Sequence, residues 1–247
     1  MGMKTRKEWI TPAGKLPILC KDMTAQPHII IAGATGSGKS VLIHSFIYSL
    51  LFRSPSSVAL ILIDPKRVEL WKYKPLPHCF RYASEPADIA ETIRDCVRIM
   101  ETRFHTMRRN NQTQTTEKPL YIIIDEFADI MTTQKRETLP GLCRLSQLGR
   151  AAGVHLIIAT QRPTKDIING QIKVNIDCRV ALRCPTGQDS RNIINQPGAE
   201  TLPRFGFGFY LTPETLHPVR VAIPYTPPDE LRARCEWWTN QTRRKWI

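Results

Sequence analysis

Residues 28–46 read HIIIAGATGSGKSVLIHSF, an apolar run that enters a glycine-rich loop and leaves it in an amphipathic segment. The loop GATGSGKS, at positions 33–40, has the spacing of a phosphate-binding P-loop between a strand and a helix. Backbone N–H groups of such a loop, together with the positive end of the following helix, attract phosphate oxygens. The stretch therefore predicts an ATP site at Gly33, Ala34, Thr35, Gly36, Ser37, Gly38, Lys39, Ser40 and Val41.

Each kind of residue in this loop has a predicted part in binding ATP. Gly33, Gly36 and Gly38 allow the backbone conformations that turn successive N–H groups toward the phosphates. The ammonium group of Lys39 is placed to neutralise the β- and γ-phosphates, and the hydroxyl of Ser40 is a ligand for Mg²⁺. We therefore expect ATP and Mg²⁺ as cofactors.

Two acidic residues end another apolar segment, LYIIIDEF at residues 120–127. In open α/β sheets, ligands bind beyond the carboxyl ends of the strands. We therefore predict that Asp125 holds the Mg²⁺ ion and that Glu126 acts as the general base that polarises the attacking water. A solvated strand end is the alternative, which the P-loop upstream disfavours.

A third apolar segment, HLIIATQRP at residues 155–163, also ends in polar residues. If this strand lies between the P-loop strand and the acidic strand, Gln161 reaches the γ-phosphate and senses whether it is present. This interpretation depends on that context, because a lone glutamine at a strand end is usually an ordinary loop residue.

Short Ile-, Val- and Leu-rich runs alternate with longer amphipathic stretches along the chain, which is typical of an α/β fold with a mostly parallel central sheet flanked by helices. We expect strands at residues 28–32, 58–63, 120–124, 154–159 and 179–183, and helices at 39–52, 86–108 and 135–152. A polar loop is expected at 110–118, a short helix at 188–194, strands joined by tight turns at 205–210, and a terminal helix at 229–238.

The composition indicates a basic protein of the cytoplasm. Its 247 residues include 35 Lys and Arg against 22 Asp and Glu, and the net charge of +13 favours a polyanionic partner. No apolar run approaches the ~18 residues of a membrane span, and residues 1–9 lack the apolar core of a secretory signal. The seven cysteines form no CxxC pair, which favours free thiols over a zinc site or disulfides.

Five segments carry a resemblance to a known family: PHIIIAGATGSGKSVLIHSFIYSLLF, LILIDPKRVEL, YIIIDEFADIM, GRAAGVHLIIATQRP and DSRNIINQPGAETL. In this order they resemble the motor domain of the FtsK/SpoIIIE family of DNA translocases, from about Pro27 to Val221. The IDPK-x-x-EL and AGVHLIIATQRP strings are far more specific than a P-loop alone.

The resemblance implies a RecA-like ATPase that assembles as a hexameric ring around duplex DNA, with ATP sites between neighbouring subunits. An arginine of the next subunit would stabilise the charge on the transferring phosphate. Arg179, in the CRVAL segment, matches such an arginine of the family; a surface-paired strand-end arginine is the alternative, and Arg162 is the next candidate. DNA contacts are expected at Arg191, Arg220 and Lys173, largely independent of DNA sequence.

The resemblance also suggests three regions: an N-terminal extension at residues 1–26, the motor at 27–224 and a basic C-terminal helix and tail at 225–247. The family's membrane region and winged-helix domain are not expected here, which favours a compact motor that transfers or packages DNA for a mobile element. A membrane or transfer-machine partner is left open. Trp237 and Trp238 are expected to dock the terminal helix on the core.

An ATPase that moves polypeptides in secretion is the alternative function, because related domains also occur in secretion machines. Such proteins usually carry several ATPase modules in tandem, whereas one module is recognisable here.

Overall fold

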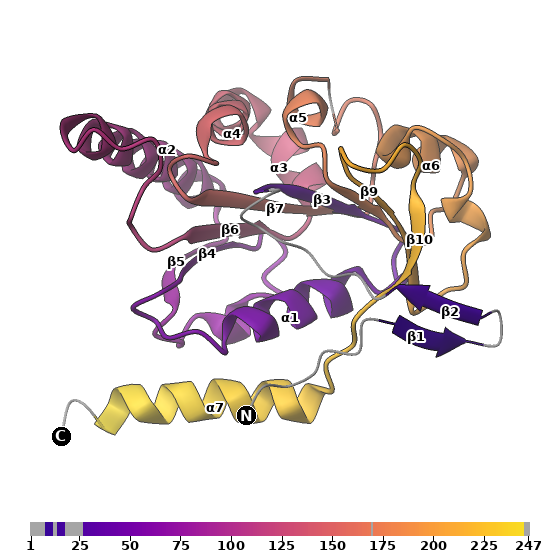
Figure 1. Cartoon of the computed structure of the whole chain (residues 1–247), viewed down its shortest axis with the longest axis horizontal. Helices are drawn as coiled ribbons and strands as arrows, with labels where there is room; N and C mark the ends of the chain where they lie inside the picture. Colours follow the sequence, from indigo (N-terminus) through magenta and orange to yellow (C-terminus); the bar gives the residue numbers. More distant parts are fainter. Residues whose placement is uncertain (1–7, 12–13, 18–26, 169, 245–247) are drawn as a thin grey trace.

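A twisted central sheet organises the computed structural model, which describes residues 8–11, 14–17, 27–168 and 170–244 (Figure 1). Its strands are β3 (Ile29–Ala32), β4 (Ala59–Ile63), β5 (Cys79–Ala83), β6 (Leu120–Ile124), β7 (Val154–Thr160), β8 (Arg179–Ala181), β9 (Phe207–Leu211) and β10 (Val219–Ala222). The order across the sheet is β10-β9-β8-β3-β7-β6-β4-β5. The strands from β8 to β5 are parallel, whereas β9 and β10 pair antiparallel at one edge.

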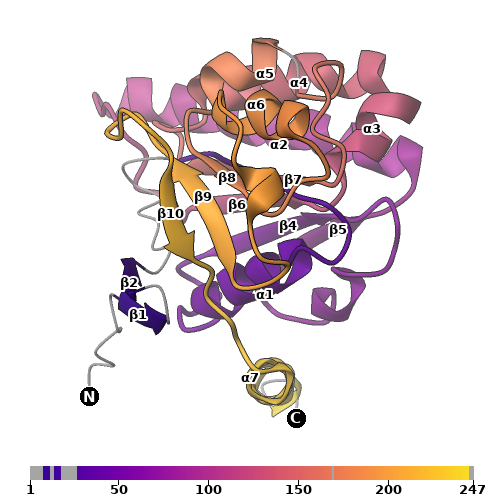
Figure 2. The same ribbon diagram turned by 90° about the vertical axis from the view of Figure 1, so that its right-hand side faces the viewer.

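Helices cover both faces of the sheet (Figures 1 and 2). One face carries α2 (Pro86–Arg109), α3 (Phe127–Thr133), α4 (Lys135–Leu148), α5 (Gly170–Asn175) and α6 (Gly187–Ile194), and the other carries α1 (Lys39–Leu50) and α7 (Pro228–Arg244). Two 3₁₀ turns, η1 (Trp71–Tyr73) and η2 (Ala199–Thr201), lie in loops between these elements, and a hairpin of β1 (Glu8–Thr11) and β2 (Gly14–Pro17) lies beside β10. The predicted α/β class with a mostly parallel sheet is confirmed.

The inner strands β3, β4, β6 and β7 are continuous apolar runs because both of their faces are buried. On β3, Ile30 packs with Phe127 of α3 in the core under the helices α2 to α6, whereas its neighbour Ile31 packs with Ile43 of α1 on the opposite face. Alternation of side chains along a strand produces this division. The sheet is therefore held from both sides, which fixes the positions of its strand ends.

The strand order places β7 between β3 and β6. The P-loop follows β3, the acidic pair follows β6 and Gln161 follows β7. Because these strands are parallel, their carboxyl ends meet at one edge of the sheet. The prediction for Gln161 required its strand to lie between the P-loop strand and the acidic strand, and β7 does so.

Some elements differ from the sequence-based expectation. The helix expected to reach residue 152 ends at Leu148, and the run at 205–210 forms the single strand β9 rather than several short strands. The edge strand β5 was not predicted, because its CFRYA sequence is only partly buried. Helix α3 was missed because it begins immediately after the acidic pair and has only seven residues.

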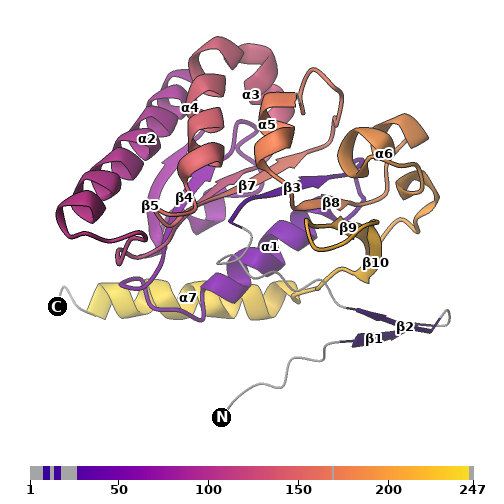
Figure 3. The ribbon, with the colours of Figure 1, turned by 45° about the horizontal axis from the view of Figure 1, so that its top comes forward.

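The terminal helix α7 runs alongside α1 (Figures 1 and 3). The indole Nε1 of Trp238 donates a hydrogen bond to the carbonyl of Leu51 at 2.8 Å, and Leu231 is buried in the same core. Trp237 is half exposed and packs edge-on against Trp238, with ring centroids 4.5 Å apart. Trp238 therefore makes the docking contact that was expected of both tryptophans.

None of the helices in the described part of the chain is both long and apolar enough to cross a bilayer.

Candidate nucleotide-binding site

The P-loop leads from β3 into α1 through two glycines with positive φ. Gly36 has φ +73° and Gly38, the N-cap of α1, has φ +96°, which an L-residue rarely adopts. Gly33 does not share this conformation: a Cβ there would come within 2.5 Å of Ser37 Oγ and 2.7 Å of Leu182 Cβ. Glycine at position 33 is therefore required for close packing, and not for the backbone freedom that the sequence suggested.

Lys39 and Asp125 form a buried ion pair at the centre of this edge of the sheet. The Nζ of Lys39 donates to Oδ1 of Asp125, and both side chains are 4% exposed. Burial raises the pKa of Asp125 even though the ammonium of Lys39 opposes the shift. The P-loop lysine and the first acidic residue, which are 86 positions apart in the sequence, are therefore in direct contact.

Glu126 lies beside this pair, is 1% exposed and has φ +62°, an unusual conformation for a residue with a side chain. Its Oε1 accepts hydrogen bonds from Thr160 Oγ1 and from the backbone N–H of Gln161, both at 3.0 Å. Its Oε2 accepts one from Lys66 Nζ, also at 3.0 Å. Burial alone would raise the pKa of Glu126, but these hydrogen bonds and the nearby lysines hold it below its ordinary value.

Gln161, which directly follows β7, contacts the P-loop. The hydroxyl of Thr35 donates to Oε1 of Gln161 at 2.7 Å. Gln161 thus connects the loop that would hold phosphates with the backbone N–H that binds Glu126. This arrangement can transmit a change at the phosphate site to the carboxylate.

The turn after β4, which contains the IDPK-x-x-EL string, completes the site. The buried Asp64 accepts hydrogen bonds from the backbone N–H groups of Glu69 and Leu70, at 3.1 and 2.9 Å. Partial burial would raise the pKa of Glu69, but hydrogen bonds from Ser40 and His44 lower it. From the sequence, this string could be recognised as specific to the family. Its contacts, from Glu69 to His44 of α1 and from Lys66 to Glu126, could not be predicted.

The donors at this edge fit a magnesium–nucleotide complex. Mg²⁺ in phosphate-binding proteins is usually held by one or two protein oxygens together with phosphate oxygens and water. Ser40 offers a hydroxyl that already hydrogen-bonds Glu69, and Asp125 offers a buried carboxylate next to the P-loop lysine. Within the described part of the chain, the buried Oγ of Ser37 has no hydrogen-bond partner, as expected in a cradle that is completed by a ligand.

Arg179 lies inside the subunit instead of at its surface. It is 8% exposed and donates hydrogen bonds to the carbonyls of Ile176 (3.1 Å), Lys173 (2.8 Å) and Ile193 (3.5 Å). These contacts tie α5 and α6 to β8, so the geometry supports a structural role and argues against the predicted contact with a neighbouring subunit. Neither a surface pair nor a free guanidinium describes this residue.

The three predicted DNA contacts differ in their exposure. Arg191 is exposed on α6, whereas Lys173 on α5 is half-buried. Arg220 on β10 is also half-buried and stacks over the ring of Phe207, 4.9 Å from its centroid. Arg191 is therefore the most accessible of the three.

Arg204 is a candidate residue of the nucleotide-binding site that was not predicted from the sequence. Its guanidinium lies over the P-loop, where Nη2 would be 3.0 Å from a Cβ at Gly36, and it is exposed. The residue belongs to none of the quoted motifs that were given a chemical role, so nothing in the sequence indicated it.

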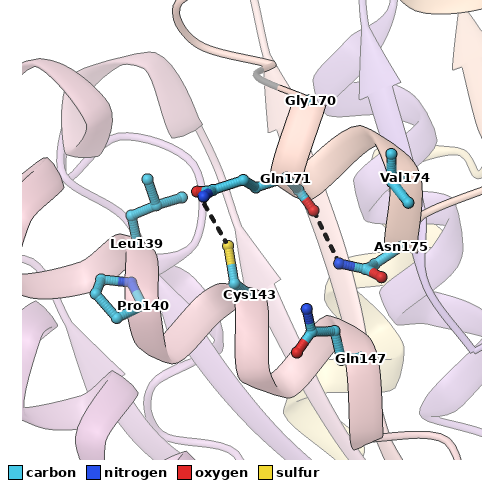
Figure 4. A pocket seen from close by; sticks show the side chains of 8 residues that line it. All are labelled: Leu139, Pro140, Cys143, Gln147, Gly170, Gln171, Val174 and Asn175. Carbon is cyan, nitrogen blue, oxygen red and sulfur yellow. Dashed lines mark hydrogen bonds between the residues drawn. The ribbon is translucent and has the colours of Figure 1, made fainter.

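A hollow of about 560 Å³ between α4 and α5 lies apart from this site (Figure 4). The Cys143 thiol faces Gln171 across it at 4.0 Å, and the exposed Val174 lies at its rim. None of the predicted nucleotide-binding residues lines the hollow. The hollow and the predicted nucleotide site are therefore separate.

Two solved structures share this fold. TcpA, the pCW3 conjugation coupling protein in its monomer form with ATPγS, matches with a TM-score of 0.77 at 24% identity, over 91% of this chain and 68% of that chain. The cytoplasmic domain of the type VII secretion ATPase EccC from Thermomonospora curvata matches with a TM-score of 0.75 at 24% identity, over 86% of this chain and 28% of that chain. The fold and the site together define a RecA-like P-loop ATPase.

The chain belongs to the FtsK/SpoIIIE family, which it matches over residues 13–118 and 104–165. It is 35% identical to the DNA translocase FtsK of Vibrio vulnificus over 93% of this chain, and 38% identical to the DNA translocase SpoIIIE of Bacillus subtilis over 85% of this chain. It spans 27% and 29% of the length of these two relatives. The resemblance found from the motifs is thereby confirmed.

Proposed function

We propose that this chain is an ATP-driven motor that moves duplex DNA in the cytoplasm. The observation that carries this proposal is the single site in which Lys39, Asp125, Glu126 and Gln161 meet, in a chain whose relatives at 35% and 38% identity are named DNA translocases. Those relatives are much longer, so the activity of the whole proteins is carried over here as a proposal.

The described residues suggest how ATP would be held and attacked. The N–H groups of the P-loop and the ammonium of Lys39 would bind the β- and γ-phosphates, so Lys39 would exchange part of its contact with Asp125 for phosphate oxygens. When bound by Ser40 and Asp125, Mg²⁺ would supply charge neutralisation on the phosphates. Glu126 would orient and deprotonate the attacking water, and Gln161 would couple Thr35 to Glu126.

We also propose assembly into a ring, because the charge on a transferring phosphate is stabilised by a further cation, which a neighbouring subunit could supply. The buried contacts of Arg179 make it a poor source of that cation. Arg162, which is exposed directly after Gln161, becomes the better candidate. A hexamer is the expected size.

The proposed DNA surface is made of arginine and lysine contacts to phosphates, led by the exposed Arg191. A motor that slides along any sequence gains nothing from reading bases, and phosphate contacts carry no sequence information. The net charge of +13 is consistent with such a polyanionic partner.

Polypeptide export is the competing function, and its support is the match to the secretion ATPase EccC. That match shows the fold alone, since TcpA fits the same fold equally well at the same identity of 24%. Relatives above 30% identity are named DNA translocases, which favours DNA as the substrate.

Duplex DNA should stimulate hydrolysis by the full chain. We expect linear duplex to raise the rate several-fold. Arg191→Ala should lose most of this stimulation, whereas Arg108→Ala, an exposed arginine at the far end of α2, should keep it. Steady-state ATPase assays with and without DNA measure the effect. Equal rates in both conditions for the folded wild type would count against the DNA motor.

A further inference from the structure

Lys66 follows β4, whereas Glu126 follows β6, and the two side chains are in contact. It lies in the turn after β4, and its Nζ is 3.0 Å from Oε2 of Glu126 and 4.0 Å from Oδ2 of Asp129. The Lys66 side chain is 39% exposed, whereas the Glu126 side chain is 2% exposed. A partly solvated cation thus contacts the buried carboxylate that is proposed as the base.

The turn that carries Lys66 is anchored by buried residues at both of its ends. Asp64 is fully buried, and its Oδ2 accepts from the backbone N–H groups of Glu69 and Leu70. Leu70 itself is buried in the core beside α1. The start and the end of the turn are therefore anchored, which limits the positions that the Lys66 ammonium can reach.

The two oxygens of Glu126 are held differently. A carboxylate oxygen can accept about two hydrogen bonds. Oε1 already accepts two, from Thr160 Oγ1 at the end of β7 and from the N–H of Gln161, which follows it. Among the hydrogen bonds of the described residues, Oε2 accepts one, from Lys66, and so retains an acceptor site for water.

We propose that Lys66 is a positioning residue for ATP hydrolysis, which fixes Oε2 of Glu126 so that its remaining acceptor site faces the attacking water. This role rests on the proposed function of Glu126 as the base. Thr160 and Gln161 hold Oε1 in place. Lys66 then determines how the carboxylate is rotated about Oε1, and so where Oε2 lies. Loss of the ammonium leaves Oε2 free to turn away, and misplacement of a catalytic group by about 1 Å can cost about 10²-fold in rate.

The neighbouring Arg67 provides a matched control. It has the same charge and lies in the same turn, but its Nη2 pairs with Oε1 of Glu85 at 2.6 Å, and both side chains are 59% exposed. An exposed pair of this kind contributes little to stability. Removing its charge changes the turn's net charge as much as removing that of Lys66, without touching Glu126.

The test compares Lys66→Met, Lys66→Arg, Arg67→Met, Glu126→Gln and the double variant Lys66→Met/Glu126→Gln in the full chain. Lys66→Met should lower kcat by about 10²-fold with KM for ATP within about twofold, because the lost interaction is made in the transition state. Lys66→Arg should recover much of the rate, and Arg67→Met should match the wild type. The double variant should be no slower than Glu126→Gln, because Lys66 acts through Glu126.

Three results would overturn the proposal. They are a Lys66→Met variant that hydrolyses ATP at the wild-type rate or faster, one that changes only KM, and a double variant much slower than Glu126→Gln. Thermal unfolding of each variant checks that the fold is intact. Wild-type hydrolysis by Glu126→Gln would overturn the base itself, and with it the role of Lys66, so the two failures are distinguishable.

Discussion

Glu126→Gln should lower kcat for ATP hydrolysis by about 10³-fold, within the usual contribution of a general base, while the variant still binds ATP. The amide keeps the size of the side chain and can still accept from Thr160 and Gln161 at its oxygen, so the pocket should persist. It removes the negative charge and the basic oxygen that would take the proton of water. Single-turnover hydrolysis and a separate measurement of nucleotide affinity check the two parts of this expectation.

Two comparisons make this result specific. Lys39→Ala should weaken nucleotide binding, because it removes the cation that faces the phosphates and leaves Asp125 buried without its partner. Glu137→Gln, the same chemical change at an exposed position on α4, should leave both rate and affinity unchanged. Hydrolysis by Glu126→Gln at the wild-type rate would show that another group is the base.

DNA affinity should fall by roughly 10³-fold between about 50 and about 200 mM salt if about six phosphate contacts form, because each neutralised phosphate releases counterions. The affinity should differ little between unrelated duplex sequences, since phosphate contacts carry no base information. Fluorescence anisotropy with labelled duplexes of different sequence, at several salt concentrations, measures both properties.

The slope of that salt dependence reports the number of contacts. Arg191→Ala should make the slope shallower by about one unit and weaken binding to all sequences alike. Arg108 belongs to α2, which lies near β5 whereas α6 lies near β8 (Figure 1), so Arg108→Ala should leave the slope unchanged. A salt-independent affinity, or a strong preference for one sequence, would contradict binding through phosphates.

The sequence predicted the central part of the fold because its strands are buried on both faces. Such strands are continuous apolar runs, and the polar residues that end them stand out. The P-loop, the Asp125–Glu126 pair and Gln161 each follow such a run, and the parallel strand order brings them to one edge. Their roles in hydrolysis stay predictions, but their proximity follows from the strand order.

Other features could not be predicted from the sequence because they depend on long-range contacts of single side chains. Nothing local shows that Arg179 turns inward to three backbone carbonyls, or that Arg204 lies over Gly36. The contact of Lys66 with Glu126 joins residues 60 positions apart through the pairing of β4 with β6. Only the specificity of the IDPK-x-x-EL string indicated that this turn has a function.

Displacement of a third strand from linear duplex DNA tests the central claim most directly. A motor that moves along duplex should strip a triplex-forming oligonucleotide from the end of the duplex when ATP is present. Glu126→Gln, which should bind ATP and DNA without turnover, should leave the triplex intact, as should a non-hydrolysable ATP analogue with the wild type. If the wild-type chain hydrolyses ATP but leaves the third strand in place, it does not translocate on DNA, and polypeptide export becomes the better account.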